Sequence, residues 1–202
     1  GGFGDVLVID SGAAATAQLV FALIEALDWP LTEAVATALY TGLVTDTGRF
    51  QYSVTTPEVH QVTARLLEAG AVPDLVGRHV YEEAPFGYLE VVGAVLRRAR
   101  LEADVRLVWS LLENADLEAA GISYEDADGL IDVLRIAEES DVACLLKELE
   151  PGVLKGSLRS RGRVDVAAIA GLFGGGGHHN AAGFTARSSV DDAIGKIRAA
   201  LS

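Results

Sequence analysis

The residues with the clearest chemical potential lie in the stretch LKGSLRSRGRVDVAAIAGLFGGGGHHNAAGF, at positions 154–184. Four glycines, Gly174 to Gly177, follow a predicted helix, although a single left-handed residue is enough to end one. Such a run turns backbone N–H groups toward an anion or lets a ligand lie on the chain, and we expect a positive φ at Gly176. Side chains that can hydrogen-bond phosphate, ribose or a base edge follow at once: His178, His179 and Asn180.

The spacing of these glycines fits neither a dinucleotide fingerprint nor a phosphate loop ending in Gly-Lys-Ser or Gly-Lys-Thr. A flexible loop is the alternative interpretation. It is less favoured, because the glycines lead into two histidines and the small apolar strand start Ala181–Phe184 rather than into Ser and Lys.

The same stretch is cationic within an acidic chain. Between Pro151 and Arg187, five basic residues stand against one acidic residue, a net charge of +4, whereas the whole chain carries −13. In a strand, alternate side chains share a face, which predicts one face bearing Lys155, Arg159, Arg161 and Arg163. A solvated strand edge protected by cations is the alternative. The overall charge excludes attraction of a polyanion to the whole surface, so any phosphate chemistry must be local.

The second half of the chain mixes strand and helix patterns. Buried strands are predicted at 105–112 and 142–149, and a half-exposed strand at 153–163. Helices are predicted at 126–138, 164–173 and 190–201. This mixture indicates an α/β domain of about 100 residues. A further helical pattern at 85–100 precedes it and is interpreted as a connecting helix.

The first half is predicted to be mainly helical. A glycine-rich start leads into a short strand, Val6 to Ile9, and Asp10 and Ser11 are expected to cap a helix through Leu27. Its predicted apolar stripe comprises Leu19, Leu23, Ala26 and Leu27. Pro30 fits the first turn of a second helix to about Tyr40, and Thr56-Pro57 starts a third that Gly70 closes. An irregular segment is expected at 41–56.

Composition places the chain in the reducing cytoplasm. The single cysteine, Cys144, lies in an apolar run and is interpreted as a buried core thiol, so no internal disulfide can form. Neither a membrane span nor a secretory leader is recognisable, which predicts a cytoplasmic protein without a membrane partner. The chain begins at Gly1 and contains no methionine, from which we expect that its natural start is missing.

Two motifs resemble one protein family. GGGGHHNAAG at 174–183, preceded by SLRSRGRVDVAAIA at 157–170, resembles the DHH-associated domain of RecJ-like exonucleases and bacterial nanoRNases. The resemblance implies a substrate-binding lobe that grips a nucleotide through Gly175, Gly176, His178 and Arg159. Arg161, His179 and Asn180 are added as substrate-binding candidates from their positions, although the role of His179 stays open.

The first half resembles the same family independently. TALYTGLVTDTGRFQYSVTT at 37–56 is similar to the last metal motif of the DHH catalytic domain, which implies that Asp46 is catalytic and binds one of two Mn²⁺ ions. Taken alone, this Asp between two threonines and a glycine suits a hard cation or an ordinary Asx turn. The chain has Ser53-Val54-Thr55-Thr56 where the family has SNTT, and it lacks the Asp-His-His motif. His60 and His79 do not replace that motif and are interpreted as surface or packing residues.

These observations predict an α/β protein in two lobes. Residues 1–84 are assigned to the tail of a DHH catalytic domain, 85–103 to a connecting helix, and 104–202 to the DHH-associated substrate-binding domain. The resemblance implies part of a manganese-dependent phosphoesterase acting on short oligoribonucleotides, 3′-phosphoadenosine 5′-phosphate or linear dinucleotides. The isolated chain is expected to be inactive, and a homodimer is left open.

Three other assignments remain. The chain could be a non-catalytic nucleotide- or RNA-binding module, or a binding scaffold. An appended domain of alanyl-tRNA synthetase is the third, against which TGLVTDTGRF at 41–50 argues.

Overall fold

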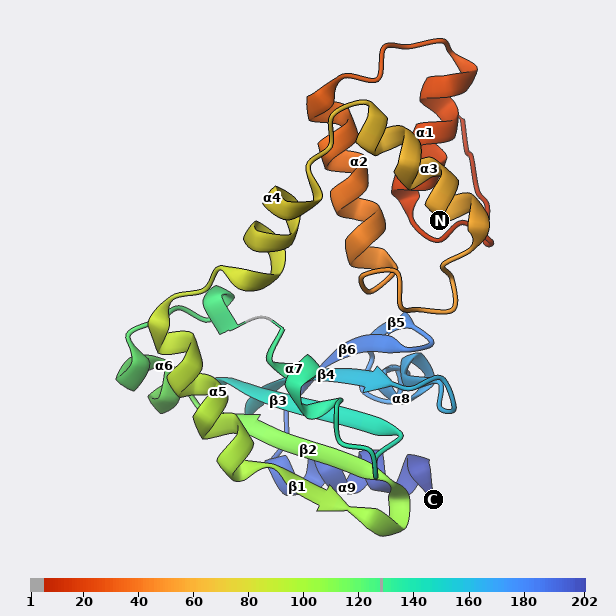
Figure 1. Ribbon diagram of the computed structural model, residues 1–202. Coiled ribbons are helices and arrows are strands. Elements are labelled where there is room, and N and C mark those ends of the chain that lie inside the picture. Colours follow the sequence, from red (N-terminus) through yellow and green to blue (C-terminus); the bar gives the residue numbers. More distant parts are fainter. Residues whose placement is uncertain (1–5, 128) are drawn as a thin grey trace. The chain divides into compact units, whose positions relative to one another are not determined.

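Two units, Gly1–Glu83 and Ala84–Ser202, make up the chain in the computed structural model, which describes residues 6–127 and 129–202 (Figure 1). The described part of the first unit is helical. The second contains a six-stranded sheet with helices on both faces, so the predicted α/β class is confirmed. In the described ranges, no helix is long and apolar enough to cross a membrane.

The first unit is built on three packed helices and a short extension. Its core contains Phe21, Ile24, Leu39, Leu43 and Leu66. The helices are α1 (Thr16–Ala26), α2 (Glu33–Asp46), α3 (Pro57–Glu68) and α4 (Pro73–Gly77), and a π-helical turn at Arg78–Glu82 follows.

The start of α3 is as predicted. The Thr56 hydroxyl accepts a hydrogen bond from the Val59 N–H, Pro57 occupies the first turn, and Gly70 beyond the helix has a φ of 102°. The predicted second helix, by contrast, starts later and ends later. Thr32 rather than Pro30 begins it, and it continues through the segment expected to be irregular as far as Asp46.

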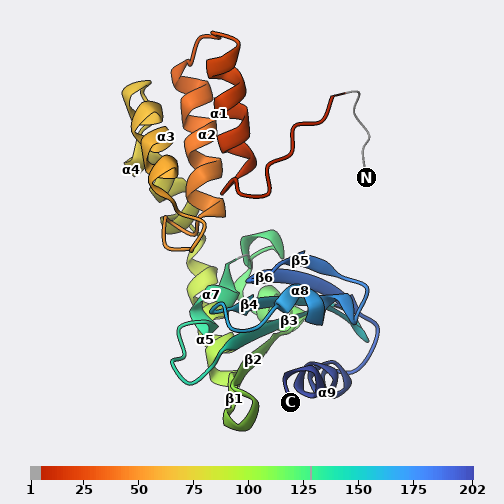
Figure 2. The ribbon, with the colours of Figure 1, turned by 90° about the vertical axis from the view of Figure 1, so that its right-hand side faces the viewer.

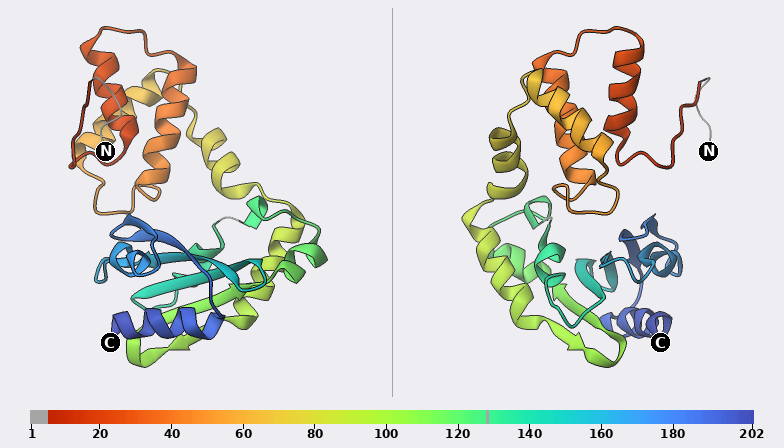
Figure 3. Two further views of the ribbon diagram at one scale, coloured as in Figure 1. Left: turned by 180° about the vertical axis from the view of Figure 1, so that it is seen from behind. Right: turned by 45° about the vertical axis from the view of Figure 1, so that its right-hand side comes forward.

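The predictions for the first 27 residues were largely wrong. Val6–Ile9 lies exposed outside any strand, because an apolar segment needs a neighbouring strand to pair with (Figure 3). The glycines before it lie outside the described residues. Asp10 accepts a hydrogen bond from the Gly12 N–H instead of capping a helix, and α1 begins only at Thr16. Its buried side chains are Phe21 and Ile24, whereas the predicted Leu23 and Leu27 are exposed.

The second unit is organised around one mixed sheet. The strand order is β1-β2-β3-β4-β6-β5, and β2 and β3 are the parallel pair. The crossover between them contains α6 (Asn114–Ala120), a 3₁₀ turn at Glu125–Ala127 and α7 (Leu130–Leu134). The strands are β1 (Arg100–Glu102), β2 (Leu107–Leu112), β3 (Val142–Glu150), β4 (Val153–Ser160), β5 (Gly176–His178) and β6 (Ala181–Ala186).

Helices cover the two faces of this sheet separately (Figures 1 and 2). On one face, α5 (Phe86–Arg98), α6 (Asn114–Ala120) and α7 (Leu130–Leu134) pack over β2 and β3. On the other, α8 (Val166–Gly171) and α9 (Val190–Leu201) cover Leu154, Leu158 and Phe184. The helix predicted as a connector, α5, buries Val91 and Val95 in the core of this second unit.

The predicted elements of this unit are present, but two of them are shorter than expected, and β1, α6 and β5 were not predicted. The half-exposed strand ends at Ser160 and not at Arg163, because the Ser160 hydroxyl accepts hydrogen bonds from the N–H groups of Gly162 and Val164 and turns the chain. The helix expected at 126–138 is reduced to the single short helix α7 after the 3₁₀ turn.

Cys144 is buried in the core beneath α8 and α9, as predicted. Burial raises the pKa of its thiol from an ordinary 9.0 to about 12.

We expect the native protein to resist thiol reagents at pH 8, and unfolded chain to react with one equivalent. Because the folded pKa is raised, the stabilisation from a neutral Cys144 is complete below pH 9 and is lost as the pH rises toward 12. Unfolding in urea between pH 8 and 11 tests this, with Cys144→Ala as the control that lacks this component. Rapid labelling of the native protein would contradict the burial of Cys144.

Candidate functional site

The pairing register of β4, β6 and β5 places the candidate residues in cross-strand rows. Directly paired residues share a face, and so do residues two apart along each strand. One row holds Arg159, Ala181 and His178, the next Ser157, Gly183 and Gly176, and the third Lys155 and Thr185. Gly176 and Gly183 therefore form a floor without side chains, with cationic residues on both sides. We call these two residues the glycine floor.

This face is open where the glycine floor lies. α7 covers the neighbouring β3 positions Ala143 and Leu145, but Lys155, Gly176, His178 and Gly183 are exposed. β4 lies between β3 and β6 and is therefore an interior strand. The alternative that its cations protect a sheet edge is thus wrong, because an interior strand has no free edge to protect.

Arg159 and His178 lie at opposite ends of the first row. Two strand spacings separate their backbones by about 10 Å. The Arg159 guanidinium donates to its neighbour's carbonyl at Leu158, and among the described residues it forms an ion pair with Asp132 at 3.8 Å. This is a weak, partly exposed pair. Arg159 is therefore available for a stronger charge-assisted hydrogen bond to a phosphate.

Arg161 and Arg163 do not share this face, contrary to the prediction, because β4 has ended before them. The Arg161 guanidinium donates to the backbone carbonyl of Arg135 at 2.9 Å. Arg163 lies 3.7 Å from the Asp141 carboxylate. A hydrogen bond from Arg106 lowers the pKa of Asp141, and the charges of Arg163 and Arg161 lower it further. These two arginines therefore serve the turn after β4.

The two histidines point to different surroundings. His178 ends β5 on the open face, whereas His179 Nε2 lies 3.2 Å from the Gly162 carbonyl and its Nδ1 lies 3.9 Å from Asp165. Asn180, in the same turn, receives a backbone hydrogen bond from the Ser160 N–H. Its side-chain Oδ1 is buried and has no hydrogen-bond partner among the described residues.

Glycine is present at the four positions Gly174–Gly177 for different structural reasons. Gly174 and Gly177 have positive φ angles of 76° and 150°, whereas Gly176 does not, so the φ expected there was wrong. A Cβ on Gly175 would lie 2.2 Å from the Gly183 carbonyl oxygen, which only glycine avoids. A Cβ on Gly176 would meet nothing within 4 Å. Gly175 is therefore needed for packing, while Gly176 leaves space above the sheet.

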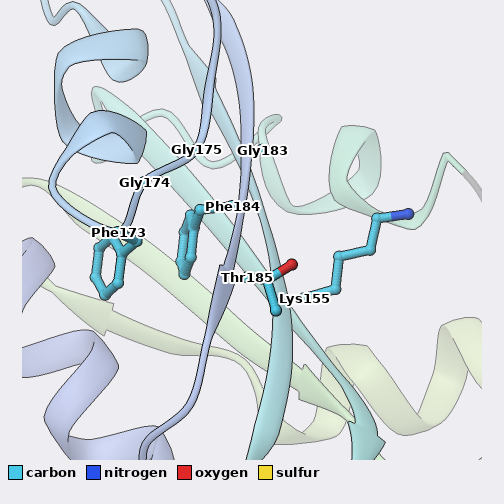
Figure 4. A pocket seen from close by; sticks show the side chains of 7 residues that line it. All are labelled: Lys155, Phe173, Gly174, Gly175, Gly183, Phe184 and Thr185. Carbon is cyan, nitrogen blue, oxygen red and sulfur yellow. The ribbon is translucent and has the colours of Figure 1, made fainter.

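An open pocket of about 330 Å³ adjoins the glycine floor (Figure 4). The rings of Phe173 and Phe184 stack at 4.1 Å on one side, and Lys155 and Thr185 point to the other. Phe184 covers one face of the Phe173 ring, and the Lys196 ammonium lies 4.7 Å from its centroid. Because Phe173 already has these neighbours, the stack is structural. The pocket is lined by Lys155, Phe173, Gly174, Gly175, Gly183, Phe184 and Thr185.

Asp46 lies in the first unit, as the exposed last residue of α2. The C-terminus of a helix carries the negative end of its dipole, and the last turn of α2 has no basic residue. A carboxylate in this position is electrostatically unfavourable by itself. It strengthens a negative potential that attracts a cation.

An unusual turn follows Asp46. Gly48, Arg49 and Phe50 all have positive φ angles, between 57° and 62°. A left-handed conformation costs about 1–2 kcal/mol for each non-glycine residue. The turn is held by the Thr47 hydroxyl, which accepts from the Phe50 N–H and donates to the Leu43 carbonyl, and by Arg49 stacked 3.9 Å over Tyr81. Such a cost, borne next to a carboxylate, is typical of a functional segment.

The described residues do not assemble a two-metal site. Among residues 6–127 and 129–202, no group of three His, Cys, Asp or Glu side chains comes together. His60 packs against Phe50 and His79 contacts Glu83, both at exposed positions. Asp46 offers one carboxylate, and the described residues do not gather two further His, Cys, Asp or Glu side chains around it.

Comparison with known proteins identifies the second unit. Residues 107–202 match the model of the DHHA1 domain. A relative from Thermus thermophilus, named bifunctional oligoribonuclease and PAP phosphatase NrnA, is 38% identical over 197 residues. The first match decides the family of this part of the chain. Residues 107–202 are a DHHA1 domain, a C-terminal domain of the DHH superfamily.

The whole chain, and not only its DHHA1 domain, matches longer proteins. The aligned residues are 96% of this chain and 58% of the Thermus protein. The NrnA of Bacillus subtilis is 24% identical over 184 residues, again 58% of its length. An exopolyphosphatase-related protein from Bacteroides fragilis has the same fold, with a TM-score of 0.88 and 27% identity over 98% of this chain and 59% of its own. The chain therefore spans under two thirds of each of these relatives.

Residues that the sequence analysis missed lie beside the open face of the DHHA1 domain. Lys147 is 4% exposed, and its ammonium donates to the Ala127 carbonyl at 2.9 Å and lies 4.7 Å from the Tyr124 ring. It is paired across the sheet with Lys155. A lysine within the predicted buried strand at 142–149 was the available signal. Ser157 and Thr185 were missed because their place depends on the register of β6.

We expect Gly175→Ala to destabilise the DHHA1 domain by about 1–3 kcal/mol, because the new methyl group overlaps the backbone of β6. The matched change Gly176→Ala should leave stability nearly unchanged, since its Cβ meets open space. Urea unfolding of both variants and the wild type measures the difference. Equal stability of the two variants would contradict a close approach of Gly175 to the backbone of β6.

Proposed function

We propose that this chain is part of a phosphoesterase that hydrolyses short oligoribonucleotides and 3′-phosphoadenosine 5′-phosphate, with the open face of β4, β6 and β5 as its substrate-binding surface. The observation that carries the proposal is the glycine floor flanked by Arg159, His178 and Lys155. The named activities of the similar proteins from Thermus and Bacillus support the choice of substrate.

Each part of the face has a chemical task in this proposal. Arg159 donates charge-assisted hydrogen bonds to a phosphate, and His178 in the same row donates another. The Ser157 hydroxyl, in the next row, can hydrogen-bond the same phosphate or a ribose hydroxyl. Because the glycine floor has no side chains, a ribose or base can lie close to the backbone there. Asn180 offers an amide in the adjoining turn.

For the whole protein we propose Asp46 as a ligand of one of two Mn²⁺ ions, with the other ligands contributed from outside the described residues. When bound, such a metal pair activates water and stabilises in-line attack on phosphorus. The contribution of Asp46 is a carboxylate at the negative end of α2, next to the left-handed turn.

Removing the Arg159 charge should weaken binding of 3′-phosphoadenosine 5′-phosphate by about tenfold, the value of one charged hydrogen bond. Arg159→Ala should also reduce the steepness with which affinity falls as salt rises, because one fewer phosphate contact releases counterions. Calorimetric titration at several salt concentrations measures both. Arg161→Ala is the matched control, since Arg161 is held by the Arg135 carbonyl. Equal losses in both variants would refute this assignment of the face.

Binding alone does not separate a phosphoesterase from a non-catalytic nucleotide-binding module. We expect the 202-residue chain to bind nucleotide but to release no phosphate from 3′-phosphoadenosine 5′-phosphate in Mn²⁺, because one proposed carboxylate cannot hold two metals. A phosphate-release assay tests this. Manganese-dependent turnover that is lost in Asp46→Asn would contradict the expectation that the chain alone is incomplete.

A further inference from the structure

We propose that Lys155, together with Thr185, forms a second anion subsite that binds a phosphate beyond the one held at Arg159 and His178. The inference rests on the proposed function and deepens it. It assigns to the domain a preference for oligonucleotides with three or more phosphates over nucleotides built on one ribose.

Lys155 is an exposed cation with no carboxylate partner among the described residues. Within the part of the chain that the structure describes, no carboxylate lies within ion-pair distance of its ammonium, whereas Arg159 and Arg163 each have one. Its backbone is fixed in the interior strand β4, where protection of an edge is not needed. Its cross-strand partner Thr185 is also exposed and offers a hydroxyl donor. An anion would complete this pair.

The Tyr124 ring holds the Lys155 side chain over the open face. The Lys155 ammonium lies 5.4 Å from the ring centroid, within the range of a cation–π interaction. Lys147, buried and hydrogen-bonded to the Ala127 carbonyl, lies 4.7 Å from the same ring. The ring is thus itself fixed by a buried group. A side chain held in place loses less freedom when a ligand binds, which favours affinity.

The spacing of the rows decides what the second subsite binds. Arg159 and Lys155 are four residues apart on β4, so their backbones are separated by about 13 Å. The 3′ and 5′ phosphates of a single ribose lie closer together than this. This separation suits phosphates two steps apart along a chain better than the two phosphates of a single ribose, so we infer that 3′-phosphoadenosine 5′-phosphate uses one end and a longer chain uses both. The glycine floor lies between them, and the open pocket of about 330 Å³ adjoins Lys155 and Thr185 (Figure 4).

The test compares two probes on the 202-residue chain by calorimetric titration: 3′-phosphoadenosine 5′-phosphate and a 5′-phosphorylated triadenylate. Lys155→Gln should weaken binding of the trinucleotide by about tenfold and that of the single nucleotide by less than twofold. The slope of log affinity against log salt should fall by about 0.7 for the trinucleotide alone. Lys155→Arg should restore trinucleotide binding, which excludes misfolding as the cause.

Two further variants define the contacts. Tyr124→Leu should give a smaller loss of trinucleotide affinity with no loss for the single nucleotide, because Lys155 is then less well held. Arg100→Gln removes a cation from β1, at the opposite end of the sheet, and should change neither. Loss of affinity for both probes in Lys155→Gln, or for neither, overturns the second subsite alone. Failure of the wild type to bind either probe overturns both this inference and the proposed function.

Discussion

The close antiparallel pairing of β6 with β4 and β5 is the constraint on which the candidate site depends. A slip of β5 by one residue would replace Gly176 and His178 on the open face by Gly177 and His179, and would turn the original pair away. The register is held where a side chain cannot fit, since a Cβ on Gly175 or Gly177 would lie 2.2 or 2.5 Å from a β6 carbonyl oxygen. Gly175 and Gly177 are therefore needed for close packing against β6, whereas Gly176 between them is exposed and meets open space.

The distribution of charge follows from the same register. A chain with a net charge of −13 repels phosphates over most of its surface, so useful cations have to be concentrated. The end of β4 at Ser160 divides the basic residues into two groups. Lys155 and Arg159 stay on the strand and face solvent or weak partners, while Arg161 and Arg163 follow the turn to the Arg135 carbonyl and to Asp141. Sequence neighbours of like charge thus acquire different tasks through one change of backbone direction.

This division shows where sequence reasoning reached its limit. A buried apolar run predicted β3, a half-exposed pattern predicted β4, and Thr56-Pro57 predicted the start of α3, because all three signals are local. The end of β4 was not readable, since it depends on the Ser160 hydroxyl accepting two backbone N–H groups. The strand predicted at Val6–Ile9 was wrong for a different reason. Its composition suits a strand, but strand formation requires a pairing partner, which composition alone does not reveal. Predicting which residues share the rows of the open face requires the pairing register of β4, β6 and β5. A single sequence does not reveal that register.

Two features at and after the TDTG segment, Thr45–Gly48, are unfavourable by themselves. Both have a physical explanation if a cation binds there. Asp46 adds a negative charge to the negative end of α2, and the following residues adopt three successive left-handed conformations. The turn packs Phe50 against the core of the first unit and buries Thr47, but the charge of Asp46 adds nothing to this packing. Asp46 itself lies exposed at the end of the helix, directly before the turn. A free helix end bearing an unneutralised carboxylate has a physical rationale if a positive ion binds there, and this is why we propose Asp46 as a metal ligand.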